Sequence, residues 1–295
     1  MTPAPHRQNI AETDRPDAEP PLISIITVVF NGVAGIEATI LSVINNASDR
    51  FEYVIIDGGS TDGTLDILRA YDSQLSYWVS EPDNGIYHAF NKGVSLARGV
   101  WVMFLGSGDL LNGPESMRNV VENLEHAPGD VQVAYGRVVT LTVGGTFVEE
   151  ENGPWSELNR EWKGGRKVMP HHQGIIQRRS FLETHPFDET YRIVADYKAF
   201  MQAIANFPPM YIDVVVAQVF VGGVTSLPRN SLFVAGEILR LNRELGSGYD
   251  HVPHQMFFFL KCAVKTVLSI LIPARTTVKI IDAYRSATRR RKKWI

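Results

Sequence analysis

The chain has 295 residues, is 44% hydrophobic and carries a net charge of −3. A chain of this length and composition can bury a substantial core, and it permits one large α/β domain with an appended segment. Its single cysteine, Cys262, excludes an internal disulfide and a cysteine-based zinc cluster, and it suits the reducing environment of the cytoplasm.

The amino-terminal residues 1 to 21 are rich in proline and charge and have no apolar core of the kind found in signal peptides. We expect a disordered leader there and no export. The main domain is expected to occupy residues 22 to 229. Residues 230 to 295 are expected to form a C-terminal helical segment that ends in a basic tail.

Four apolar runs predict buried strands, and the segments between them carry apolar residues at helical spacing. The predicted strands are Ile23–Phe30, Tyr53–Ile56, Leu75–Val79 and Val100–Leu105. The helical stripes are Ile36, Ile40 and Ile44 in one segment and Ile86, Phe90, Val94 and Ala97 in another. This alternation favours an α/β fold with a Rossmann-like, mostly parallel sheet flanked by helices on both faces.

Beyond these runs the pattern is less regular. A further strand is predicted at Val131–Thr140, and Gly144–Val168 is expected to be an irregular excursion or hairpin over the edge of the sheet. Ser231–Leu245 predicts a helix, and Pro253 opens another apolar segment.

The segment Phe51–Thr64, FEYVIIDGGSTDGT, joins an apolar strand to an acidic, glycine-rich turn that opens a helix. Asp57 stands at the end of the strand, Gly58 and Gly59 allow a close turn, and Asp62 can cap the helix. Open α/β sheets bind ligands at this kind of strand end. The alternative is a turn whose aspartates act only as caps.

Polar residues follow each of the four predicted strands: Asn31, Asp57, Glu81 with Asp83, and Asp109. If the strands are parallel, these residues converge on one crevice. Clustered acids repel one another, so such a crevice implies a cation or a hydrogen-bonding ligand, and a nucleotide with a metal supplies both. Acids that only keep loops soluble are the alternative.

Together with ISIITVVFNG at Ile23–Gly32 and SEPDNGIYHAFNKG at Ser80–Gly93, this segment closely resembles the family 2 glycosyltransferases, which have the GT-A fold. The clearest resemblance runs from Leu22 to Asp109, and a weaker one continues through PHHQGIIQRRS and YRIVADYKAF. The resemblance implies transfer of a sugar from a nucleotide diphosphate sugar to an acceptor, usually with a divalent metal, Mn²⁺ or Mg²⁺.

The resemblance also implies a group of donor-binding residues. Its members are Thr27, Val29, Asn31, Asp57, Asp83, Lys92 and Ser107. Asp57 would accept a hydrogen bond from the nucleotide base, while Lys92 would contact ribose or phosphates unless it is a solvated surface lysine. The family often has an aspartate where His88 stands, and we expect His88 to make a structural hydrogen bond.

The metal site is expected in FLGSGDLL. The family commonly has Asp-x-Asp or Asp-Asp near here, whereas this chain has Ser107-Gly108-Asp109, which leaves Asp109 as the metal ligand. One carboxylate plus the donor diphosphate can hold a hard divalent ion. A weak-metal or metal-free enzyme is the alternative.

The resemblance places His172 and Gln173 against the leaving diphosphate or the acceptor, and it makes Asp196 the catalytic base. Asp188 is the competing base and resembles a turn residue, and helix capping is the alternative for Asp196. Two arginines, Arg178 and Arg179, either hold phosphates or coat the surface.

Near the C-terminus, Met256–Ile272 is apolar but short for a membrane span and is interrupted by Lys261 and Lys265. We expect a helix in the membrane interface, with the basic cluster in Arg285–Ile295 on anionic lipid at the cytoplasmic face. A buried core helix with a solvated basic tail is the alternative. No motif for nucleic acid accompanies the cluster.

The sequence therefore predicts an inverting glycosyltransferase that acts on a hydroxyl of a glycan or lipid-linked acceptor in surface polysaccharide synthesis. Two alternatives stay open: a sugar nucleotidyltransferase, and a catalytically silent homologue that binds nucleotide or acts as a membrane scaffold, which Gly108 and His88 motivate. A dinucleotide oxidoreductase is disfavoured because no G-x-G-x-x-G follows the first strand.

Overall fold

The computed structural model describes most of the chain. The described residues are 20–46, 48, 50–142, 144–159, 162–163, 166–167, 169–221, 228–246, 252–272, 276, 280 and 283. The expected leader, apart from its last two residues, and the basic cluster of Arg285–Ile295 lie outside this set. The chain divides into two compact units, Met1–Val138 with Pro170–Val219 and Val139–Met169 with Phe220–Ile295.

The first unit is built on four parallel strands. They are β1 (Ile23–Val29), β2 (Phe51–Asp57), β3 (Tyr77–Ser80) and β4 (Trp101–Phe104), in the spatial order β3-β2-β1-β4. All four predicted strands are confirmed, and their buried side chains form the centre of the core. Their carboxyl ends therefore meet at one edge of the sheet.

Beyond β4 the sheet becomes antiparallel. Strand β10 (Ile175–Arg178) lies antiparallel between β4 and β6 (Val133–Leu141), and β11 (Met210–Phe220) is followed by β5 (Leu110–Leu111). The predicted strand at Val131–Thr140 is confirmed as β6. The whole sheet is thus mixed, and the antiparallel direction of β10 brings its first residues to the carboxyl end of β4.

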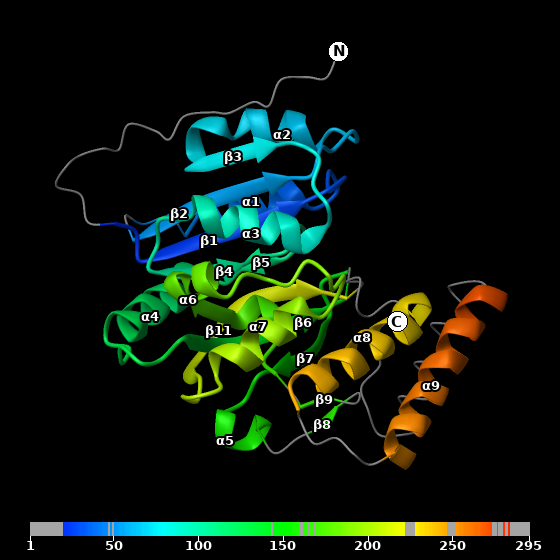
Figure 1. Cartoon of the computed structure of the whole chain (residues 1–295). Helices are drawn as coiled ribbons and strands as arrows, with labels where there is room; N and C mark the ends of the chain where they lie inside the picture. The colour runs from blue at the N-terminus through cyan, green and yellow to red at the C-terminus, as the bar shows by residue number, and fades with distance from the viewer. Residues whose placement is uncertain are drawn as a thin grey trace. The chain divides into compact units, whose positions relative to one another are not determined.

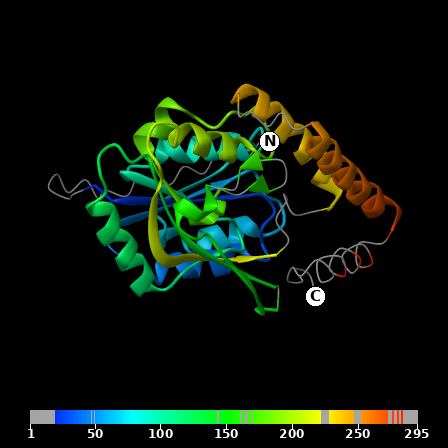
Figure 2. The same ribbon diagram turned by 90° about the horizontal axis from the view of Figure 1, so that it is seen from below.

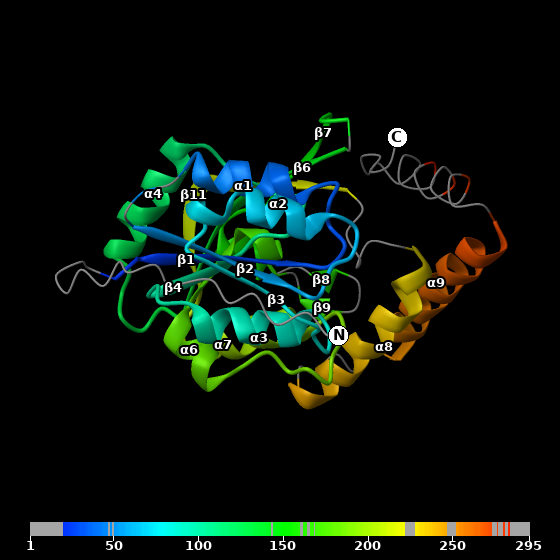
Figure 3. The same ribbon diagram turned by 90° about the horizontal axis from the view of Figure 1, so that it is seen from above.

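Helices cover both faces of this sheet (Figure 3). On one face lie α1 (Ile36–Ile44) and α2 (Thr64–Ala70), and on the other lie α3 (Ile86–Leu96), α6 (Arg179–Thr184) and α7 (Ala195–Ala203). The predicted stripe of α1 is confirmed, since Ile36 and Ile40 are buried and Ile44 packs partly buried on the core. Helix α4 (Pro114–Glu125) buries Met117, Val120 and Leu124.

The buried face of α3 differs from the prediction at its first residue. Ile86 is 47% exposed, whereas Tyr87, Phe90 and Val94 are buried. Ile86 opens the helix directly after Gly85, which has a φ of 118°, and the face that meets the sheet begins one residue later. The expectation that Ile86 faces the core is therefore wrong, and Tyr87 takes its place.

In the second unit, β7 (Phe147–Glu151) pairs with β6, and a short hairpin joins β8 (Trp162–Lys163) to β9 (Arg166–Lys167). Helix α5 (Trp155–Leu158) lies between them in sequence. The predicted helix at Ser231–Leu245 is confirmed as α8 (Ser231–Glu244).

Helix α9 (Val252–Leu271) packs beside α8, as Figures 1 and 2 show. Among the helices of the described residues, none combines the length and the apolar character that crossing a membrane requires. The 3₁₀ turns are η1 (Asp72–Gln74), η2 (His172–Gly174) and η4 (Pro228–Asn230).

Candidate functional site

Asp57 organises the loop that follows β2. It is 0% exposed, and its Oδ2 accepts hydrogen bonds from the N–H groups of Gly59 (3.0 Å) and Ser60 (2.9 Å) and from the hydroxyl of Ser80 (2.6 Å). Its Oδ1 accepts from the Ser60 hydroxyl. The carboxylate therefore ties the loop after β2 to the end of β3.

Asn31 connects the end of β1 to the same loop. Its backbone has a φ of 51°, a left-handed conformation that asparagine tolerates better than most residues. Its N–H donates to the Ser60 Oγ (2.7 Å), and its side-chain oxygen accepts from the Thr61 N–H (2.9 Å). Asp62 accepts from the Thr64 N–H (3.1 Å), but the N-cap residue of α2 is Gly63 and the helix has no side-chain cap, so the predicted cap at Asp62 lies one residue outside the N-cap position.

The residues near the end of β1 differ in their exposure to solvent. Thr27 is buried and shares a hydrogen bond with the Tyr53 hydroxyl (3.1 Å), and Val29 is also buried. The exposed side chain of this strand end is Phe30, at 66%. The apolar pattern predicts Phe30 as the last residue of a buried strand, and this prediction is wrong. The Asn-Gly turn that directly follows Phe30 marks the end of the strand.

Phe30 and Asp83 flank the backbone of Gly58. A Cβ atom added to Gly58 would lie 2.7 Å from Asp83 Oδ2 and 3.4 Å from Phe30 Cδ2. A side chain at position 58 would therefore displace the Asp83 carboxylate from its place beside the backbone. An aromatic face, a carboxylate and open backbone thus lie side by side, and together they can stack on and hydrogen-bond a planar heterocycle.

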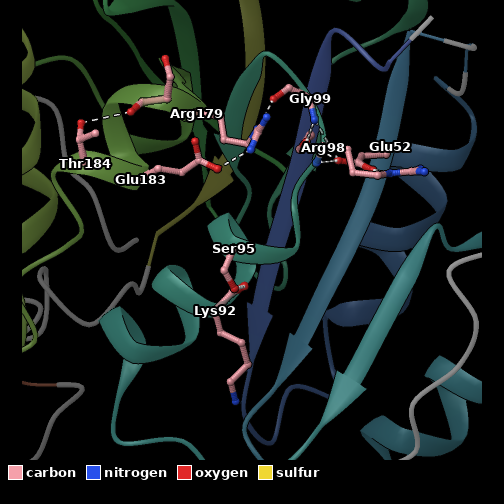
Figure 4. Close-up of polar contacts among 10 residues, drawn as sticks. Glu52, Lys92, Ser95, Arg98, Gly99, Arg179, Glu183 and Thr184 are labelled. Carbon is pink, nitrogen blue, oxygen red and sulfur yellow. Dashed lines mark hydrogen bonds and ion pairs between the residues drawn. The ribbon is translucent and has the colours of Figure 1, made fainter.

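Lys92 extends from α3 toward the carboxyl ends of the strands (Figure 4) and forms an ion pair with Glu81 (2.8 Å). Its ammonium group is therefore placed near the loop after β3. His88 Nδ1 accepts a long hydrogen bond from the Asn84 N–H (3.5 Å), in line with the structural role expected for His88.

The candidate metal loop packs tightly on α1. Gly108 has a φ of 98°, its N–H donates to Thr39 Oγ1 (2.8 Å), and a Cβ on Gly35 would lie 2.7 Å from Gly108 Cα. A side chain at position 108 would strain this positive-φ backbone, so glycine suits the position. Ser107 Oγ is buried and has no hydrogen-bond partner in the described part of the chain.

Asp109 is held by the η2 turn. Gln173 Nε2 donates to Asp109 Oδ2 (2.9 Å), and a Cβ on Gly106 would lie 2.5 Å from the same oxygen. No group of three or more His, Cys, Asp or Glu side chains within the described ranges is arranged to hold a metal ion. One positioned carboxylate fits a cation that takes its other ligands from a diphosphate and water, as Mg²⁺ commonly does.

Asp196 lies in the first turn of α7. Its Oδ1 accepts a hydrogen bond from the Tyr87 hydroxyl (3.1 Å), and its Oδ2 is 3.7 Å from His172 Nδ1. Burial lowers the pKa of His172, and the Asp196 charge opposes this shift only in part, so the imidazole is neutral at pH 7. His172 Nε2 is buried without a hydrogen-bond partner among the described residues.

Two consecutive residues of η2 therefore reach the two carboxylates singled out from the sequence. His172 lies beside Asp196, and Gln173 binds Asp109. Since η2 directly precedes β10, the antiparallel direction of β10 is what brings this turn to the carboxyl edge of β4.

Asp188, the competing candidate base, is committed to a turn. Its Oδ1 accepts from the N–H (3.0 Å) and the hydroxyl (2.7 Å) of Thr190, and its Oδ2 pairs with Lys198 (2.7 Å). Burial acts to raise its pKa, but the hydrogen bonds from Lys198 and Thr190 and the Lys198 charge outweigh burial and lower the pKa to about 2. Such a carboxylate is a weak proton acceptor.

Asp188→Asn is expected to lower the free energy of unfolding at pH 7 by about 2 kcal/mol, because a carboxylate with a depressed folded-state pKa stabilises the fold above its unfolded pKa. This contribution should shrink as the pH falls from about 4, the unfolded pKa of aspartate, through the folded pKa of about 2. Urea unfolding of parent and variant at pH 7 and pH 3.5 measures it.

Asp66→Asn is the matched control for Asp188→Asn, since its ion pair with Arg69 is exposed and should contribute little. Equal midpoints for the Asp188 variant and the parent at pH 7 would contradict the assignment of a stabilising ion pair.

Arg178 and Arg179 lie at the opposite edge of the sheet. Arg178 pairs in register with Trp101, the first residue of β4, and its guanidinium stacks on the Trp101 ring (4.1 Å). Arg179 donates to the Gly99 carbonyl (2.9 Å), next to the buried Glu52 (Figure 4). Both arginines therefore bind groups at the amino ends of the strands, away from the Asp57 and Asp109 loops.

A comparison of folds gives the class of protein first. A mannosyltransferase from Pyrobaculum calidifontis, solved in complex with GDP-Man and Mn²⁺, superposes with a TM-score of 0.59 and 17% identity, over 92% of this chain and 83% of that one. The fold is therefore the α/β GT-A type, with a curled mixed sheet flanked by helices.

Sequence comparisons then give the family. The model of glycosyl transferase family 2 matches residues 24–185. An uncharacterized glycosyltransferase of Mycobacterium tuberculosis is 31% identical over 79% of this chain and 89% of its own length. A glycosyltransferase of PGL/p-HBAD biosynthesis from Mycobacterium bovis is 33% identical over 67% of this chain and 76% of its own length. The chain belongs to the family 2 glycosyltransferases and is a transferase enzyme.

Proposed function

We propose that this glycosyltransferase moves a sugar from a nucleotide diphosphate sugar to a hydroxyl of a glycan or lipid-linked acceptor, with inversion at the anomeric carbon. The observation that carries the proposal is the η2 turn, whose adjacent residues His172 and Gln173 reach Asp196 and Asp109. A proton acceptor and an anchor for a phosphate-bound cation are thereby held in one site. A role in polysaccharide or glycolipid synthesis is supported by the M. bovis relative, which is named for PGL/p-HBAD biosynthesis.

On the donor side, the base stacks on the exposed Phe30 and hydrogen-bonds Asp83, which flank the Gly58 backbone. Asp57 is fully buried and shapes this loop through its hydrogen bonds with Ser60 and Ser80, so direct contact with the base falls to Phe30 and Asp83. Asn31 fixes the loop from β1, while Thr27 and Val29 support it from inside the strand.

The leaving diphosphate is received between α3 and the loop after β4. Lys92 supplies a cation on one side, and the unpartnered Ser107 hydroxyl supplies a hydrogen bond on the other. Asp109, oriented by Gln173, would hold Mn²⁺ or Mg²⁺ together with donor oxygens. When bound, such a cation supplies positive charge that stabilises the diphosphate as it leaves.

On the acceptor side, the Asp196 carboxylate removes the proton from the attacking hydroxyl. The acceptor oxygen forms a bond to the anomeric carbon from the face opposite the diphosphate. The carbon–oxygen bond to the diphosphate breaks, and its electron pair leaves with the nucleoside diphosphate. A single displacement of this kind inverts the configuration, and it requires one base on the acceptor side.

A thermal-shift panel of nucleotide sugars, with and without Mn²⁺, tests donor binding. A ligand at a hundred times its Kd adds about 2.7 kcal/mol to the stability, or a rise in Tm of about 5–10 °C for a domain of this size. We expect one nucleotide to give the largest shift, and Mn²⁺ to enlarge it. No shift with any nucleotide sugar would contradict the proposal, and a shift without turnover would favour the silent homologue.

We further propose that α9 lies on an anionic membrane surface. Its apolar residues Leu260, Val264, Val267, Ile270 and Leu271 are exposed, as are Lys261 and Lys265, while Cys262 on the other side is buried. The apolar side can enter the interface while the lysines reach the headgroups. The basic residues of Arg285–Ile295 add charge of the same sign.

The double variant Lys261→Gln/Lys265→Gln is expected to weaken binding to anionic vesicles about 30-fold, since each cation near such a surface contributes about 1 kcal/mol. The parent should bind more weakly as salt rises. Vesicle flotation at low and high salt measures both effects. Arg118→Gln, an exposed site on α4, is the control. A double variant that floats like the parent would contradict the membrane proposal.

A further inference from the structure

The hydroxyl of Tyr87 connects α3 to the start of α7. Its O–H donates a hydrogen bond to Asp196 Oδ1 (3.1 Å). The two residues are 109 positions apart in the chain. The Tyr87 hydroxyl on α3 therefore donates to a carboxylate carried by the first turn of α7.

The ring of Tyr87 is fixed by other aromatic rings. It stacks on Phe187 (5.9 Å, 19°) and meets Phe90 edge-on (5.7 Å, 85°), while Phe90 in turn stacks on Phe104 (4.2 Å). Packing of this density leaves the ring one orientation, so the hydroxyl has a fixed position. Burial and the nearby Asp196 charge raise the pKa of Tyr87 far above its usual value, which keeps the hydroxyl protonated as a donor.

The contacts of Asp196 divide between its two oxygens. Tyr87 holds Oδ1, whereas Oδ2 lies 3.7 Å from His172 Nδ1, beyond hydrogen-bond distance. The titratable side chains that face this carboxylate from the neighbouring elements are thus Tyr87 of α3 and His172 of η2. A carboxylate bound through one oxygen is held in a single rotamer and keeps the lone pairs of the other oxygen free.

We propose that Tyr87 is a positioning residue for the reaction: it holds Oδ1 of Asp196 so that Oδ2 is presented to the hydroxyl of the acceptor. This inference rests on the proposed role of Asp196 as the base. Precise placement of a catalytic group governs the rate, because a misplaced group must be brought into line before the reaction. The Tyr87 ring alone would supply core packing, so the hydroxyl is what carries the positioning role.

Tyr87→Phe keeps the ring and removes the hydroxyl. We expect kcat to fall about tenfold or more, in the range seen when a partner that orients a functional group is lost, with the KM for the nucleotide sugar unchanged. A purely structural role would also weaken donor binding or stability, whereas a positioning role confines the loss to kcat.

Tyr71→Phe is the matched control, since it also removes a tyrosine hydroxyl that donates to a carboxylate, Glu37 (2.9 Å), but far from Asp196 in the fold. It should leave kcat unchanged. The second variant places 3-fluorotyrosine at position 87, which keeps both the ring and the hydroxyl. It should keep most of the parental kcat, and it serves as the test if Tyr87→Phe does not fold.

Two results would overturn the inference: a folded Tyr87→Phe with parental kcat, or a folded 3-fluorotyrosine protein whose kcat falls tenfold although it keeps the hydroxyl. In the Asp196→Asn background, Tyr87→Phe should cost little further rate, and a full additional loss would also contradict it. A parent without transfer activity would instead contradict the proposed function, and the inference with it.

Discussion

Asp196→Asn is expected to lower turnover by about 10²–10⁴-fold, the range for loss of a general base, while the affinity for the nucleotide stays nearly unchanged. Asparagine keeps the size of the side chain and can still accept the hydrogen bond from Tyr87. It cannot take up the proton of the acceptor hydroxyl, so the chemical step should fail after binding. Single-turnover rates together with calorimetric nucleotide affinity separate the two effects.

Asp188→Asn is the matched control for turnover, because Asp188 lies in the same segment but pairs with Lys198 and Thr190. At temperatures where it stays folded, the Asp188→Asn variant should keep most of the parental turnover rate. If Asp196→Asn retained parental turnover with chemistry as the slow step, the base would have to be sought elsewhere. Loss of turnover in the Asp188 variant alone would move the role to Asp188.

Asp109→Asn is expected to weaken donor binding in Mn²⁺ by at least about tenfold, since losing even an outer partner of a metal ligand typically costs about 10–100-fold in affinity. The loop offers no other carboxylate, because Ser107 and Gly108 precede Asp109. Binding of the nucleotide without metal should change little. Calorimetry with and without Mn²⁺ gives both affinities.

Asp66→Asn, on the exposed side of α2, is the control for a lost negative charge and should match the parent in both conditions. The Asp109 variant could instead bind the donor as tightly as the parent, both with and without Mn²⁺. That result would remove Asp109 from the metal site. An equal loss in both conditions would instead assign Asp109 to direct contact with the nucleotide.

The parallel half of the sheet could be predicted from sequence because its signals are local. Each strand is a continuous apolar run, and each is followed by polar residues or glycine, as at Asn31 and Asp57. Side chains that end parallel strands must meet at one edge, so the approximate place of the donor site followed from strand direction alone.

The acceptor half depends on contacts that sequence spacing does not reveal. Strand β10 is short, and only its antiparallel direction brings His172 to the crevice while carrying Arg178 to the opposite edge. Tyr87 was missed because an apolar stripe counted from Ile86 leaves it as a neutral position on the helix. Its partner, Asp196, lies 109 residues away, and only tertiary packing brings the two together.

Product analysis tests the proposed reaction most directly. The purified chain is incubated with the nucleotide sugar that stabilises it most and with a hydroxyl acceptor, and the released nucleotide and the new linkage are identified by chromatography and NMR. We expect one nucleoside diphosphate for each glycosylated acceptor, with an anomeric configuration inverted from that of the donor. Release of pyrophosphate, which a nucleotidyltransferase would give, or retention of the donor configuration would contradict a single displacement assisted by Asp196.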